Sequence, residues 1–167
     1  MPEKIGIRDA CETDLEAVLC LNKTFEHFLS PLDLGELVAL VDAAAYFRVA
    51  EIDGKIAAFL VAFVSKAKYD SVNYRWFDGR FDDFAYIDRI AVVASAQGQS
   101  LGPRLYDDLA NFARSKGLAQ LTCEYYIEPM NEGSARFHKR YGFKEIGQQA
   151  LEGGKKRVSL QSCALVP

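Results

Sequence analysis

The pattern of apolar and polar residues predicts strands that alternate with helices. Apolar runs over residues 46–52 and 55–66 predict two strands, and Asp53-Gly54 between them is a strong hairpin signal. Residues 84–93 are almost continuously apolar, as expected for a strand that is buried on both faces. Shorter segments predict the remaining strands, at residues 5–8, 121–126, 143–147 and 156–164.

Helices are expected where start and stop signals bracket a helical periodicity. Thr13 and Glu16 have the spacing of a capping box, which predicts a helix that begins there, and a second helix is expected over residues 34–45. A longer one follows Gly102 and ends at Gly117, and the last runs over residues 131–141. The polar and aromatic stretch 67–83 is expected to be a long loop.

This order, β-α-α-β-β-β-α-β-α-β-β, predicts an α/β (α+β) fold with a mixed sheet and helices on its faces. The chain has 167 residues, which suits one compact domain, so residues 1–167 are expected to form a single domain.

Composition and charge narrow the classes of function. Half of the residues are hydrophobic and 26% are charged, which is typical of a globular protein and excludes a disordered one. The net charge of −3 does not favour a nucleic-acid binder, and no apolar run approaches the roughly 20 residues of a membrane span. Four cysteines without C-x-x-C spacing and two histidines predict reduced thiols in a cytoplasmic protein without a metal site.

The strongest candidate for chemistry is the turn Gln97-Gly98-Gln99-Ser100-Leu101-Gly102-Pro103, between a buried strand and a helix. The first amides of a helix lack main-chain partners, and the helix dipole adds positive charge, so such a turn can bind phosphate groups. The turn is neither a Walker loop nor a G-x-G-x-x-G motif. The alternative is that it merely connects a strand to a helix.

Three segments in order resemble the GNAT superfamily of acetyl-coenzyme A (acetyl-CoA)-dependent N-acyltransferases. They are residues 86–92, the turn 97–102, and Asn131-x-x-Ser134-Ala135-x-Phe137-x-x-x-Tyr141-Gly142-Phe143. The N-terminal residues 7–15 also resemble the family's first strand and helix, so that the resemblance spans residues 5–147. It implies a mostly antiparallel central sheet that is flanked by helices on both faces. It also implies transfer of an acetyl group from acetyl-CoA to an amine by direct attack in a ternary complex.

The resemblance further implies where the cosubstrate binds. The pyrophosphate would lie on amides of the turn, the pantetheine arm would run beside the end of the buried strand, and Asn131 would contact the pantetheine side. The implied cofactor-binding residues are Ile90, Ala91, Val92, Gln97, Gly98, Gln99, Ser100, Leu101, Gly102, Arg104, Asn131 and Ser134. Ser100 stands where the family has glycine, and Pro103 removes one amide from the helix start.

Two residues are implied as catalytic. His138 occupies the position, four residues before Gly142, where the family often has a tyrosine that protonates the leaving thiolate. The alternative is a structural histidine, with Tyr125, Tyr126 or Tyr141 as proton donor. Asp88, in an apolar strand, would accept the amine's proton or bind a cationic substrate, and the alternative is a salt bridge, for example with Arg89.

The expected partner is a small-molecule or peptide amine, with no nucleic acid and no membrane, and a homodimer is left open. The rival function is a non-catalytic acyl-CoA-binding or regulatory module of the same fold. The identity of the amine and the length of the acyl chain do not follow from the sequence.

Overall fold

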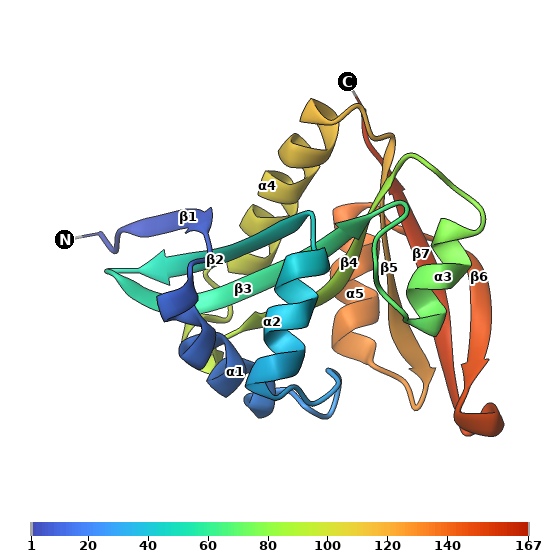
Figure 1. Cartoon of the computed structure of the whole chain (residues 1–167), viewed down its shortest axis with the longest axis horizontal. Helices are drawn as coiled ribbons and strands as arrows, with labels where there is room; N and C mark the ends of the chain where they lie inside the picture. The colour runs from blue at the N-terminus through green and yellow to red at the C-terminus, as the bar shows by residue number, and fades with distance from the viewer. Residues whose placement is uncertain (1, 167) are drawn as a thin grey trace. The chain divides into compact units, whose positions relative to one another are not determined.

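The computed structural model describes residues 2–166, which form five α-helices and seven strands (Figure 1). The helices are α1 (Leu15–Thr24), α2 (Leu34–Ala43), α3 (Val72–Asp78), α4 (Leu101–Ser115) and α5 (Glu132–Tyr141). The strands are β1 (Ile5–Asp9), β2 (Tyr46–Ile52), β3 (Lys55–Val64), β4 (Phe84–Val92), β5 (Gln120–Glu128), β6 (Lys144–Leu151) and β7 (Lys156–Ala164). None of the helices among residues 2–166 is long and apolar enough to cross a membrane.

The strands form one mixed sheet in the order β1-β2-β3-β4-β5-β7-β6. The pairs β1–β2, β2–β3, β5–β7 and β6–β7 are antiparallel. Strands β4 and β5 instead run parallel, with Phe84–Tyr86 opposite Gln120–Thr122. The predicted α/β class, with a mostly antiparallel sheet, is therefore confirmed.

Contact clustering divides the chain into two compact units, each with its own buried side chains. The first comprises the residues up to Phe63, Ala67–Tyr69 and Ile87–Leu109, and it holds the nearly continuous buried run of β3. The second comprises Val64–Lys66, Asp70–Tyr86 and the residues from Ala110 onward. Within the second unit, β5 supplies side chains to both faces. On one face, Glu124 accepts a hydrogen bond from the Tyr86 hydroxyl, and the Tyr86 ring packs on Tyr74 of α3. On the other face, the ring of Tyr125 packs on His138 of α5.

Two local expectations were wrong. The stretch 67–83 is not a continuous loop, because it contains α3, whose start is capped by the Ser71 hydroxyl. The predicted capping box at Thr13 is also absent from the described chain. A short 3-10 turn, Glu12–Asp14, precedes α1 instead, and the Asp14 carboxylate accepts a hydrogen bond from the Cys11 amide at 2.7 Å.

Gly147 of β6 lies directly beneath the Trp76 ring of α3. A Cβ atom at position 147 would lie 2.7 Å from Cζ2 of Trp76. The ring cannot yield easily, because its other neighbours fix it: the Arg80 guanidinium lies 3.9 Å from its centroid, and the Phe77 ring packs against its edge. The absence of a side chain at Gly147 is therefore what allows α3 to pack on this part of the second unit.

We expect Gly147→Ala to lower the free energy of unfolding by about 1–3 kcal/mol, because the added methyl group overpacks the contact with Trp76. Chemical denaturation followed by tryptophan fluorescence measures this directly. Gly6→Ala is the control, since a Cβ atom there meets nothing within 4 Å, and its effect should stay within about 0.5 kcal/mol. Equal stabilities of the two variants would contradict the packing argument.

Candidate active site

The predicted phosphate-binding turn leads from β4 to α4 within the first unit. The Val93 amide donates to the Ala57 carbonyl of β3 at 2.7 Å, which fixes the chain as it leaves β4. Gln97 then folds back, and its side-chain amide donates to the Val92 carbonyl at 3.2 Å. The Arg104 amide donates to the Ser100 carbonyl at 3.1 Å, so that Ser100 marks the start of α4.

Two residues of this turn have left-handed backbone conformations. Gly98 has a φ of 92°, which glycine adopts freely, and Ser100 has a φ of 62°, which is uncommon for a residue with a side chain. The amides of Leu101 and Gly102 occupy the first positions of α4, where a helix offers no main-chain acceptor. The turn thus combines the positive end of a long helix with amides that can donate to an anion.

Asp88 of β4 is at the centre of a buried polar cluster in the first unit. Its side chain is 5% exposed, and that of its neighbour Arg89 is 6% exposed. The Tyr69 hydroxyl donates to Oδ1 of Asp88, and Nε of Arg89 donates to Oδ2 at 2.8 Å. Tyr69 is held in place by its ring, which stacks on Phe63 with centroids 4.1 Å apart. Both carboxylate oxygens of Asp88 are therefore engaged.

The other side of Arg89 secures the chain between α1 and α2. Its Nη1 atom donates to Oδ1 of Asn22 and to the Ser30 carbonyl, each at 3.0 Å, and Nδ2 of Asn22 donates to the same carbonyl. Burial disfavours the charged guanidinium, but the charges and hydrogen bonds of Asp88 and Tyr69 outweigh it and raise the pKa of Arg89 above its usual value. The salt bridge that the sequence left open as an alternative for Asp88 is thus present.

The residues predicted from the third motif lie in the second unit, at the start of α5. Asn131 is the N-cap of this helix, and its side-chain oxygen accepts from the Ser134 amide at 3.2 Å. The helix ends at Gly142, whose φ of 119° is left-handed. Both Asn131 and Ser134 therefore have a structural role in α5, whether or not they also contact a cosubstrate.

His138 of α5 is buried, with 6% of its surface exposed. Its ring packs against those of Phe137, Phe143 and Tyr125. Nδ1 lies 2.8 Å from the Ser134 carbonyl, and since a carbonyl only accepts, Nδ1 carries the proton. Burial lowers the pKa of His138 below its usual value, and the hydrogen bond to Ser134 offsets part of this effect. The imidazole is therefore neutral at pH 7.

A second buried carboxylate, Glu124, was not predicted from the sequence. Glu124 lies in β5, its Oε2 atom is buried, and its Oε1 atom accepts from the Tyr86 hydroxyl at 2.9 Å. Like Asp88, Glu124 interrupts a strand of apolar and aromatic residues, and this is the signal in the sequence that marks it.

The predicted residues thus form two groups. Asp88, the end of β4, the turn and Arg104 belong to the first unit, whereas Asn131, Ser134 and His138 belong to the second. Among residues 2–166, no group of three or more His, Cys, Asp or Glu side chains could hold a metal ion.

The comparisons with known proteins agree with the resemblance that the motifs carry. The family model described as Acetyltransferase (GNAT) family matches residues 14–143. This match covers most of the chain, so the chain belongs to the GNAT acetyltransferase family. No curated protein sequence matches it.

Solved structures share the fold at low sequence identity. The ribosomal-protein-S18-alanine N-acetyltransferase from Escherichia coli has a TM-score of 0.74 and 19% identity, with 98% of this chain and 96% of that chain covered. Ard1 from Thermoplasma volcanium has a TM-score of 0.79 and 17% identity, with 98% and 99% covered. The structure of yncA from Salmonella typhimurium, solved with its cofactor acetyl-CoA, has a TM-score of 0.73 and 22% identity, with 97% and 94% covered.

We expect His138 to titrate below its unfolded-state pKa of 6.5. As the pH falls, the unfolded chain then takes up a proton first, so the stability that the neutral imidazole contributes is present above about pH 6.5 and is lost below it. In His27→Gln, which leaves one imidazole, the NMR titration of the native ring should have its midpoint below 6.5. The unfolding free energy of the wild type should fall more between pH 7.5 and 5.5 than that of His138→Gln. A native midpoint at or above 6.5 would refute the assignment.

Proposed function

We propose that the protein transfers an acetyl group from acetyl-CoA to an amine by direct attack in a ternary complex. The observation that carries this proposal is the turn between β4 and α4, with left-handed Gly98 and Ser100 at the start of a 15-residue helix. Membership of the GNAT family and the acetyl-CoA bound in the yncA structure support it.

The turn fits the pyrophosphate of coenzyme A in charge and in donor groups. The amides of Ser100, Leu101 and Gly102 would hold it, and the positive end of the α4 dipole favours its negative charge. The Gln99 amide, which was predicted to join them, instead donates to the Ala96 carbonyl at 3.2 Å. Arg104 is exposed one position beyond Pro103 and would add a full positive charge. Ile90, Ala91 and Val92 would border the pantetheine arm, and Asn131 and Ser134 would contact it. When bound, the cosubstrate supplies an acetyl thioester that an amine can attack.

Two carboxylates are candidates for taking up the proton that an attacking amine must lose. Asp88 was predicted for this role, and that role stays a prediction. Arg89 neutralises its charge, and Tyr69 and Arg89 occupy its oxygens, so its surroundings favour a positioning role. Glu124 is the second candidate because its carboxylate is buried in β5 and accepts a hydrogen bond from the Tyr86 hydroxyl.

His138 also stays a prediction as the proton donor to the leaving thiolate. With Nδ1–H donated to Ser134, its other ring nitrogen carries a proton only in the imidazolium form. Because the pKa of His138 is lowered, this form is scarce at pH 7. Tyr125 remains the alternative donor on the same part of the second unit, although burial raises the pKa of its hydroxyl above the usual value.

These surroundings also support the second candidate function, a non-catalytic module that binds an acyl-CoA. An engaged Asp88 and a neutral His138 suit such a module as well as an enzyme. The two functions differ in product: only the enzyme releases coenzyme A in the presence of amines. A panel of small-molecule and peptide amines, assayed for thiol release, separates them.

We expect Gly102→Glu to weaken acetyl-CoA binding by more than about tenfold, because it sets a carboxylate beside the amides that would hold the pyrophosphate. Isothermal titration calorimetry gives the affinity. Asn111→Glu is the matched control, since it adds the same side chain at an exposed position further along α4 and should leave the affinity unchanged. Unchanged binding by Gly102→Glu would remove the turn from the binding site.

We expect Glu124→Gln to lower kcat by roughly 10²-fold, with a loss that shrinks as rising pH supplies free amine. Asp88→Asn should instead lower the free energy of unfolding, because it leaves Arg89 buried without its counter-charge, while kcat of the folded fraction stays close to wild type. Both variants keep the size of the side chain, so pH–rate profiles and thermal melts of the two can be compared directly. A loss of kcat in Asp88→Asn at wild-type stability would instead support the predicted base role of Asp88.

A further inference from the structure

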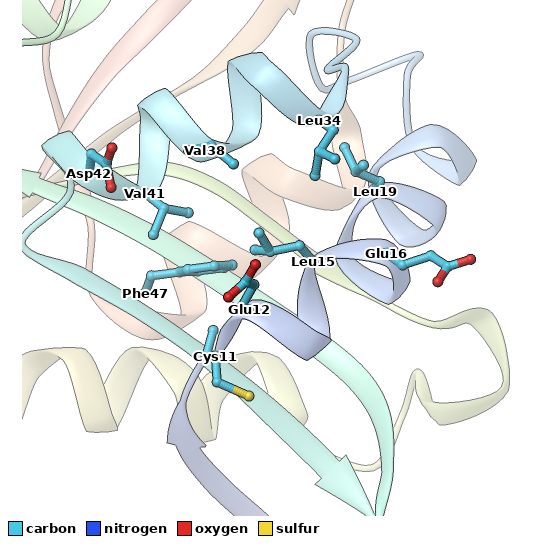
Figure 2. A pocket seen from close by; sticks show the side chains of 11 residues that line it. Cys11, Glu12, Leu15, Glu16, Leu19, Leu34, Val38, Val41, Asp42 and Phe47 are labelled. Carbon is cyan, nitrogen blue, oxygen red and sulfur yellow. The ribbon is translucent and has the colours of Figure 1, made fainter.

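A groove of about 610 Å³ lies between α1, α2 and β2 in the first unit (Figure 2). Its size falls within the range of small-molecule sites, about 300–1,000 Å³. The residues that line it come from the segment Ala10–Phe47. None of the residues predicted to bind coenzyme A is among them, so the groove is a different feature from the turn that begins α4.

The interior of the groove is apolar. Figure 2 shows that Leu15, Val41 and Phe47 point into the space between the three elements. Leu34 and Val38, one turn apart on α2, extend this surface outward and are 55% and 41% exposed. Large exposed apolar side chains that border a concave apolar space mark a surface able to bury part of a ligand.

Every charged residue that lines the groove is acidic. They are Glu12, Glu16 and Asp42, and the lining contains no lysine, arginine or histidine. In the described part of the chain, no salt bridge involves these three acids. An apolar space with a rim of carboxylates is complementary in charge to a cation that carries an apolar body.

Among the three acids, the exposed Asp42 also has an unfavourable place in its helix. It lies in the last turn of α2, at the negative end of the helix dipole, and no basic residue accompanies it there. A carboxylate in this place is electrostatically unfavourable, and a bound cation would offset both its charge and the dipole.

We propose that this groove binds an amphipathic organic cation, with its apolar body between α1 and α2 and its ammonium group near Asp42. A second copy of the chain fits less well, because a two-fold interface would bring the same acids of both copies together. The site is independent of the proposed acetyl transfer, and its test needs neither acetyl-CoA nor activity.

The test compares three probes that share one apolar body, 4-phenylbutylamine, 4-phenylbutanol and 4-phenylbutyrate, by NMR titration of the isotope-labelled full chain. The amine should shift amide resonances of α1, α2 and Phe47, and it should bind roughly tenfold more tightly than the carboxylate, with the alcohol between them. Higher salt should weaken binding of the amine and leave that of the alcohol unchanged.

Variants locate the site and its charge. Val38→Lys places an ammonium group at the groove and should abolish binding of the amine, with an unchanged thermal melt because Val38 is partly exposed. Asp42→Asn should weaken the binding of the amine about two- to fivefold and leave the affinity for the alcohol unchanged. Glu26→Gln, an exposed acid outside the lining, is the control and should bind as the wild type does.

Three results would overturn the proposal. Equal affinity for the three probes would show an unspecific apolar surface. Shifts outside the groove that persist in Val38→Lys would place amine binding elsewhere. Concentration-dependent self-association that Val38→Lys removes would assign the groove to a second copy of the chain. Acetyl-CoA binding by Val38→Lys, measured in parallel, reports on the proposed function separately, so either proposal can fail alone.

Discussion

The first unit depends on the buried ion pair between Asp88 and Arg89, which bonds to several of its segments. Neither charge can remain in a strand interior unpaired, because removing one partner of a buried pair typically costs 3–5 kcal/mol. Arg89 retains donors after it has bound Asp88, and these recruit Asn22 of α1 and the Ser30 carbonyl. The second carboxylate oxygen of Asp88 accepts a hydrogen bond from the Tyr69 hydroxyl. One pair of adjacent residues thereby holds three segments that are far apart in sequence.

The same pair constrains the chemistry. Asp88 is engaged on both oxygens, by the Tyr69 hydroxyl and by the Arg89 guanidinium, and these partners fix its position. Glu124 of β5 is a second buried carboxylate, and the comparison of Glu124→Gln with Asp88→Asn tests which of the two takes part in the proposed reaction.

The features that could be predicted from the sequence depend on local pattern. The apolar run of β4 and the glycines at 98 and 142 identified a strand, a turn and a helix end, because each reflects the preference of neighbouring residues. Helix α3 was missed because it has only seven residues, and it is stabilised by the packing of Tyr74 and Phe77 on Tyr86. The bonds of Arg89 to Asn22 and Ser30 could not be predicted, since these residues lie 67 and 59 positions away along the chain.

The acids of the groove differ from other acids of the first unit because no arginine pairs with them in the described part of the chain. In the first unit, the less exposed carboxylates are matched by guanidinium groups. Arg8 donates to both oxygens of Asp14 and holds the pKa of that carboxyl well below its usual range, and Arg48 pairs with Asp108 at 2.7 Å. Arginine suits these sites because its planar fork binds a carboxylate and still has donors for neighbouring groups. The acids around the groove are exposed and have no salt-bridge partner among the described residues, and they border apolar side chains. A cation with an apolar body would satisfy both conditions at once, since its body covers Leu34 and Val38 while its charge meets the carboxylates.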